Sequence, residues 1–199
     1  MVAIGVTGHR YVADLDAITA GVDRALGRIE EMFPSQPLTI MSPLAEGADR
    51  LVAREVLARP GARLVVPLPL PQSDYIADFA SDESKEEFLA LLDRADEVIM
   101  LPPAPTRDQA YAAAGRYVLD HCDVLVAIWD GQRAQGPGGT GDIVAEARRR
   151  GMPLALIHAG NRNLGTHEPT TLGGEQGKVS FEGFPDQPSL HQENGCSSD

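Results

Sequence analysis

The fold is decided by residues 123–152, DVLVAIWDGQRAQGPGGTGDIVAEARRRGM. The apolar, β-branched run Val124–Trp129 predicts a strand that is covered on both faces. The glycine-rich residues 131–141 cannot continue that strand, and we expect a helix to open at Asp142. Gly151 fits the position just beyond the end of such a helix. The stretch therefore predicts a strand, a loop and a helix in succession.

A glycine-rich loop that feeds a helix exposes backbone N–H groups at the positive end of the helix dipole. Such an end binds anions, most often phosphate, so Gly138, Gly139, Thr140 and Gly141 are candidate phosphate ligands. The loop lacks the Lys–Ser/Thr pair that ends a Walker A motif. The first strand is followed by GVTGHR rather than by the dinucleotide fingerprint. Both departures argue against a nicotinamide or flavin dehydrogenase, and we predict no cofactor.

The composition predicts one ordinary globular domain, since 43% of the 199 residues are hydrophobic and 23% are charged. No apolar run approaches the roughly 20 residues of a membrane span. The start lacks the basic region of a secretory signal, so the expected location is cytoplasmic, with no membrane partner. Cys122 and Cys196 suggest neither a disulfide framework nor a metal cluster. The net charge of −12 argues against nucleic acid as a partner but is compatible with a small anionic ligand.

The rest of the chain alternates between short apolar runs, which are typical of buried strands, and segments whose apolar residues recur at helical spacing. Apolar runs predict six strands, at residues 2–7, 38–41, 63–68, 97–101, 124–129 and 153–158, with helical patterns between them. This alternation predicts an α/β fold, a doubly wound Rossmann-like parallel sheet of about six strands with helices on both faces. The expected domain is residues 1–159. Residues 160–199 lose periodicity and predict a mostly disordered polar and acidic tail, in which residues 179–184 are a candidate edge strand or packing segment.

Two capping-box patterns place helix starts. Ser84 with Glu87, and Thr106 with Gln109, have the spacing at which a hydroxyl and a longer polar side chain cap each other's backbone N–H groups. Tyr75 is expected in a short helical turn before the first of them, where it is a candidate to line a pocket.

Ligands of open parallel sheets bind at the carboxyl ends of the strands, which selects the loops at residues 8–10, 42–50 and 130–141. Gly8, Gly47 and Gly131 stand in these loops beside polar or charged residues. Arg10 and Arg50 are candidate phosphate or carboxylate partners, because a guanidinium fork suits planar and tetrahedral oxyanions.

Three further side chains of these loops are candidate ligand contacts. His9 is a candidate to polarise a substrate or bind a base, although a single loop histidine is more often structural. Glu46 and Asp130 are candidate acceptors for sugar hydroxyls, and Asp130–Gly131 is also an ordinary turn signal. Asp49 is expected in the first turn of its helix, where a carboxylate favours the dipole.

Three motifs together resemble the SLOG superfamily of Rossmann-like proteins, which includes the Smf domains of DNA-processing protein A, the LOG ("lysine decarboxylase-like") phosphoribohydrolases and the YpsA-type proteins. They are GVTGHR, SPLAEGADRLVARE and WDGQRAQGPGGTGDIVAEA, each following a predicted strand. The second is similar to the glycine-rich loop of Smf domains, and the third resembles the PGGxGT loop of LOG enzymes. The third also resembles nucleoside 2-deoxyribosyltransferases. The resemblance covers about residues 1–158 and implies a nucleotide or nucleoside-derived small molecule as ligand.

Both related enzyme classes act on an N-glycosidic bond and use a glutamate in the helix after the loop. In this chain the LOG glutamate position falls on Ala145 and the transferase nucleophile position on Ile143. The candidate catalytic carboxylates are therefore Glu146, one residue beyond the LOG position, and Asp142 in the first turn. A helical step of about 100° turns Glu146 to a different face.

Three functions follow as hypotheses. The leading one is nucleotide binding by a SLOG-type domain, as a sensor or as an enzyme of unknown reaction. The alternative is a phosphoribohydrolase or N-glycosidase that cleaves nucleoside monophosphates through Glu146 or Asp142. The third is a non-catalytic self-associating scaffold, and the commonly dimeric state of LOG-type proteins implies a homodimer as a candidate assembly.

Overall fold

The computed structural model describes residues 1–133, 138–160, 170 and 173–185, and within them the chain forms one seven-stranded sheet. The strand order is β4-β3-β2-β1-β5-β6-β7. All neighbouring strands are parallel except β7, which is antiparallel to β6. The strands are β1 (Val2–Gly8), β2 (Leu38–Met41), β3 (Arg63–Leu68), β4 (Glu97–Met100), β5 (Val124–Trp129), β6 (Leu154–His158) and β7 (Val179–Glu182).

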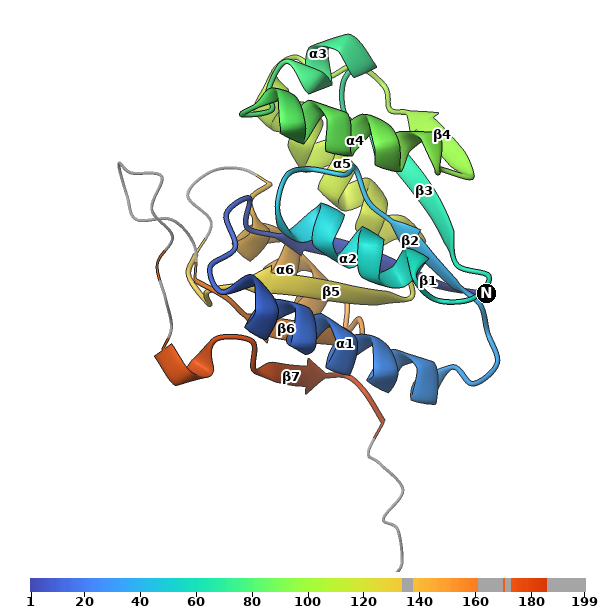
Figure 1. Cartoon of the computed structure of the whole chain (residues 1–199), viewed down its shortest axis with the longest axis vertical. Coiled ribbons are helices and arrows are strands. Elements are labelled where there is room, and N and C mark those ends of the chain that lie inside the picture. The colour runs from blue at the N-terminus through green and yellow to red at the C-terminus, as the bar shows by residue number, and fades with distance from the viewer. Residues whose placement is uncertain (134–137, 161–169, 171–172, 186–199) are drawn as a thin grey trace, which may run out of the picture.

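Helices cover both faces of this sheet, which confirms the predicted α/β, doubly wound class. Helices α1 and α2 pack on one face, and α5 and α6 pack on the other (Figure 1). Buried side chains of α4 share a core with α1 and α2. The helices are α1 (Leu15–Met32), α2 (Ala48–Leu57), α3 (Gln72–Ile76), α4 (Asp82–Asp93), α5 (Arg107–His121) and α6 (Thr140–Arg149). Among the residues that the structure describes, none of these helices combines the length and the apolarity that crossing a membrane requires.

The sheet continues beyond the six predicted strands. Residues 179–182 pair antiparallel with β6, which confirms the edge-strand alternative for this segment (Figure 1). The Arg24 guanidinium donates to the carbonyl oxygen of Gly177 (2.6 Å), which ties the turn before β7 to α1. The folded unit therefore extends past residue 159. Residues 161–169, 171–172 and 186–199 of the predicted tail lie outside the described residues.

Two helix starts differ from the sequence prediction. The N-cap of α4 is Ser81, whose hydroxyl accepts from the N–H of Ser84, because the side chains of Ser84 and Glu87 are engaged elsewhere. The last helix begins at Thr140, two residues before the predicted Asp142, because Gly139 takes the extended N-cap conformation. The predicted cap at Thr106 is confirmed, since its hydroxyl accepts from the N–H of Gln109.

The topology creates one switch point. The chain runs outward from β1 through β2 and β3 to β4, then returns through α5 to β5 on the opposite side of β1. The connection that follows β1 leads to α1 on one face of the sheet, and the connection that follows β5 leads to α6 on the other face. These two connections therefore diverge at the carboxyl ends of their strands. In doubly wound sheets this divergence opens the crevice in which ligands bind.

Candidate functional site

A cavity of about 520 Å³ lies over the carboxyl end of β1, at the switch point. Its walls are the end of β1 with the loop that follows it, the β2–α2 loop with the first turn of α2, the segment from the end of β3 to α3, the inner face of α5, and the start of α6 with the glycines before it. Its lining includes Gly8, Arg10, Asp49, Tyr75, Tyr111 and the run Gly138, Gly139 and Thr140. Tyr75, a candidate pocket residue, lies in the cavity wall while being only 2% exposed.

The glycine loop reaches the cavity because Gly138 packs tightly against α5. Gly138 has a φ of +77°, and a Cβ there would lie 2.6 Å from Cα of Ala112. Its N–H donates to the Asp142 carboxylate (3.2 Å), so this donor is already used within the loop. The N–H groups of Thr140 and Gly141 belong to the first turn of α6, where helix geometry provides no acceptor. The N–H donors left for an acceptor at this end are therefore those of the first turn, where Thr140 lines the cavity and Gly141 does not.

Arg10 supplies positive charge to the cavity. It lies in the β1–α1 loop and is exposed. Within the described residues its guanidinium makes no ion pair or hydrogen bond, and its charge acts on Asp49, Tyr75 and Tyr111. The Tyr111 hydroxyl donates to the Asp78 carboxylate, which also accepts from Arg107 (2.6 Å). Arg10 is thus available to a ligand, whereas Arg107 is already paired.

Asp49 is the buried acid of the cavity. Its Oδ2 accepts from the Ser42 hydroxyl (3.1 Å) and from the N–H of Ala45 (3.3 Å). Burial raises the pKa of this carboxyl to about 7, although both hydrogen bonds and the charges of Arg50 and Arg10 lower it. The group therefore titrates near neutrality. Sequence reasoning treated Asp49 as a dipole-favouring residue, because nothing in the motif SPLAEGAD indicates that this carboxylate is buried.

The β2–α2 loop is shaped around Asp49. Leu44 is fully buried with a φ of +58°, a conformation that costs a non-glycine residue energy. The Ser42 hydroxyl accepts from the N–H of Leu44 (3.0 Å) while it donates to Asp49. Gly47 has a φ of +79°, and a Cβ there would lie 2.3 Å from the carbonyl oxygen of Arg10. Gly47 therefore lets the two loops meet without lining the cavity itself.

Arg50 does not line the cavity, because its side chain is buried beneath α4 with 1% exposure. Its Nε donates to the carbonyl oxygen of Leu44 (3.0 Å), and its Nη1 donates to Ser84 and to Glu87. Its guanidinium carbon lies 4.5 Å from the centroid of the Phe79 ring. The predicted anion partner is thus committed to joining α2 to α4.

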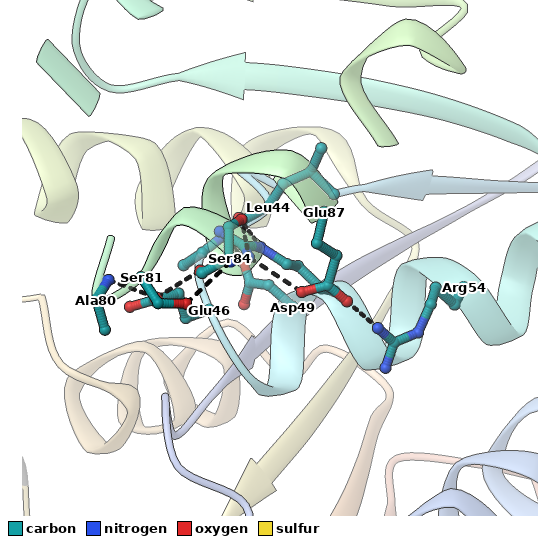
Figure 2. Close-up of polar contacts among 10 residues, drawn as sticks. Leu44, Glu46, Asp49, Arg54, Ala80, Ser81, Ser84 and Glu87 are labelled. Carbon is teal, nitrogen blue, oxygen red and sulfur yellow. Dashed lines mark hydrogen bonds and ion pairs between the residues drawn. The ribbon is translucent and has the colours of Figure 1, made fainter. Parts of the chain in front are cut away.

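Glu46 belongs to the same junction (Figure 2). Its Oε1 accepts from the N–H of Ala80 (2.9 Å) and from the Ser84 hydroxyl (2.6 Å). Figure 2 also shows Glu87 bound to Arg54 on α2. Glu46, predicted to bind sugar hydroxyls, is therefore engaged by the start of α4 and is absent from the cavity lining.

His9 connects β1 to β5 below the cavity. It is 8% exposed, and its Nε2 accepts from the N–H of Asp130 (3.0 Å). Burial lowers the pKa of His9, although Asp130 raises it. The Asp130 carboxylate accepts from the N–H of Gln132 (2.9 Å), and Gly131 follows with a φ of +81°, so this pair forms the turn that its sequence also predicts. None of these three residues lines the cavity.

The two candidate catalytic carboxylates line another, smaller cavity of about 320 Å³ between α5 and α6. Glu146 accepts from Arg149 (2.5 Å) and from Arg150 (2.7 Å), and these bonds lower its pKa to about 2. Asp142 is the acceptor of Gly138 described above. Within the described residues, no three potential metal ligands of the His, Cys, Asp or Glu type cluster together.

No protein-family model matches the chain, and no curated protein matches it. Among solved structures, the chain is similar to the X-ray structure of TM1055, a structural genomics target. The two sequences are 16% identical, the match covers 77% of this chain and 72% of that one, and the TM-score is 0.44.

Proposed function

We propose that this chain binds a nucleotide or nucleoside-derived small molecule in the cavity over β1, as a SLOG-type sensor or ligand-binding domain. One observation carries the proposal. The cavity at the switch point contains an uncommitted guanidinium, from Arg10, and the first turn of a helix preceded by glycines. Both features favour a phosphate group.

The remaining walls suit the rest of a nucleotide. A volume of about 520 Å³ lies within the usual range for small-molecule sites, roughly 300–1,000 Å³. Tyr111 supplies a half-buried aromatic ring, and the buried ring of Tyr75 lies behind it with a centroid separation of 6.1 Å. Asp49 supplies a carboxyl that can bind a sugar or base donor. A phosphate at one end and a hydrogen-bonding, partly aromatic surface at the other match the two ends of a nucleoside monophosphate.

Calorimetric titration tests the proposal with AMP, GMP, CMP and UMP and with the corresponding nucleosides. We expect a monophosphate to bind more tightly than its nucleoside. Arg10→Gln should weaken monophosphate binding about tenfold or more, since a hydrogen bond to a charged group is worth about 1.5–3 kcal/mol. The same variant should leave nucleoside affinity unchanged. Arg94→Gln, on the exposed end of α4, removes the same charge outside the cavity and controls for net charge.

Two results would contradict different parts of the proposal. If none of the nucleotides binds, nucleotide recognition is refuted. If Arg10→Gln and Arg94→Gln weaken binding equally, the effect is one of net charge, and the assignment of Arg10 is wrong.

The hydrolase alternative is tested with the same reagents. Because Glu146 is held ionised between two arginines, it is a poor proton donor near neutrality. We expect Glu146→Gln to leave AMP affinity as in the wild type. Release of free adenine from AMP that Glu146→Gln or Asp142→Asn abolishes would instead establish the alternative.

A further inference from the structure

The two oxygens of Asp49 have different surroundings. Oδ2 is fixed by the Ser42 hydroxyl and the N–H of Ala45. Oδ1 has no hydrogen-bond partner within the described residues, and it remains accessible to solvent. Since Asp49 lines the cavity, one oxygen is held by the β2–α2 loop and the other is open to the cavity.

Charged and titratable groups approach this carboxyl from three elements. Arg10 acts from the β1–α1 loop, Arg50 from the next position on α2, and Tyr75 from α3. Arg50 is held by α4, and Tyr75 is a buried phenol whose own pKa is raised by burial. In the described part of the chain, no cation forms an ion pair with Asp49. Its open oxygen is therefore left for a ligand group.

We propose that Asp49 is a specificity-determining residue of the cavity, whose Oδ1 accepts a hydrogen bond from a neutral O–H or N–H donor of the bound nucleotide. This inference rests on the proposed function and adds the group that is recognised. Two sources of the donor share this chemistry, the sugar hydroxyls and an amino group of the base. An ionised carboxylate is an acceptor only, so such a ligand selects the ionised form.

The selection makes binding depend on pH. The Asp49 pKa of about 7 means that both protonation states are populated near neutrality. If the ionised form alone binds, affinity is full above that pKa and falls about tenfold between pH 8 and pH 6. The phosphate of a nucleotide also titrates in this range, with a second pKa of about 6. A variant at Asp49 is needed to separate the two effects.

Asp49→Asn provides that variant, and the hydrogen bonds of the β2–α2 loop define the orientation of its side-chain amide. The Ser42 hydroxyl and the N–H of Ala45 are both donors to one atom, so the carbonyl oxygen of asparagine takes that place. The NH₂ group then faces the cavity and replaces an acceptor with a donor. Asp108→Asn is the matched control, because it removes an exposed carboxylate that lines the same cavity.

The experiment is calorimetric titration of AMP, 2′,3′-dideoxy-AMP and purine riboside 5′-monophosphate, at pH 6 and pH 8. With AMP we expect the wild type and Asp108→Asn to lose about tenfold more affinity at the lower pH than Asp49→Asn loses. The analogue that abolishes the difference between wild type and Asp49→Asn identifies the donor. Loss with the dideoxy sugar identifies the hydroxyls, and loss with purine riboside identifies the amino group.

Carbon-13 NMR of the wild-type aspartate carboxyls, with Asp49 assigned, provides a second readout that does not depend on the variant folding. Saturation with AMP should lower the apparent pKa of Asp49. An Asp49 pKa that AMP leaves unchanged or raises overturns the inference. It is also overturned if Asp49→Asn keeps the full wild-type pH dependence of AMP affinity. A difference in affinity between wild type and Asp49→Asn that neither analogue abolishes overturns it as well. If none of AMP, GMP, CMP and UMP binds at either pH, the proposed function falls together with this inference; the other adverse results leave nucleotide binding intact.

Discussion

Replacing Asp49 by asparagine is expected to stabilise the folded chain at pH 8 and to have little effect near pH 4. Folding raises the pKa of this carboxyl from 3.8 to about 7, so the folded state favours the protonated acid. The stability that this preference contributes is complete below the unfolded value and is lost as the pH rises through about 7. At pH 8 the fold must hold a buried anion with only two hydrogen bonds to one of its oxygens.

The magnitude follows from the size of the shift. A displacement of about three pKa units corresponds to at most about 4 kcal/mol at 1.36 kcal/mol per unit. Asparagine is neutral at every pH and keeps the acceptor for Ser42 and Ala45, so it resembles the protonated acid. The free energy of unfolding of Asp49→Asn should therefore exceed that of the wild type by up to this amount at pH 8. The excess should vanish towards pH 4.

Urea unfolding at several pH values measures this difference, with the fluorescence of Trp129, the single tryptophan, as the signal. For a typical slope of about 2 kcal/mol per molar urea, the full effect moves the midpoint by about 2 M. His9 titrates equally in both proteins and cancels in the comparison. A difference of the same size at pH 5 and at pH 8 would refute the reasoning, because it would come from packing rather than from ionisation.

Three further changes test the loops around the cavity. Arg50→Met should lower the free energy of unfolding by about 3 kcal/mol in urea, since it removes the buried cation that joins α2 to α4; a neutral result would mean that apolar packing alone holds this junction. Gly47→Ala should cost about 2 kcal/mol or more by thermal unfolding, because its Cβ would meet the carbonyl oxygen of Arg10, whereas Gly61→Ala, with a φ of +70° and Cβ of Pro37 as the nearest atom at 4.0 Å, should cost about 1 kcal/mol. Because burial lowers the pKa of His9, the stability that its neutral imidazole contributes is lost as the pH falls below about 6.5; the free energy of unfolding of the wild type relative to that of His9→Gln should therefore decrease between pH 8 and pH 5, since the opposite contribution of Asp49 cancels in this difference, and a difference that stays constant would contradict this.

The course of the chain was predictable because its strands are continuous apolar runs. The bounds of β2, β3 and β5 agree with the sequence prediction, since strands covered on both faces need no polar residue inside them. β7 had a weaker signal because it is an exposed edge strand of four residues. The start of α6 was misplaced because Thr140 and Gly141 have low helix propensity, and Gly139 fixes the boundary by its backbone conformation.

The site was predictable only where it depends on position along a strand. Gly8, Arg10 and the glycine loop reach the cavity because parallel strands bring their carboxyl ends to one edge. The roles of Glu46 and Arg50 depend instead on partners about 34 to 38 residues away in α4. Sequence spacing contains no information on which loop side chains a distant helix will cover, and burial by that helix decides whether a charged group is free or committed.

The neighbouring residues Asp49 and Arg50 show how one helical turn contributes both to the cavity and to the packing of the fold. They are about 100° apart around α2, so when Asp49 faces the cavity, Arg50 must face elsewhere. Arg50 binds Ser84 and Glu87 and packs on Phe79, which fixes the segment that carries Tyr75 into the cavity wall. Arg50 therefore positions a wall of the cavity rather than lining it. It follows that Arg50→Met, if it folds, should weaken AMP binding less than Arg10→Gln does and should do so equally for AMP and adenosine, since it disturbs the aromatic wall and leaves the phosphate donors in place.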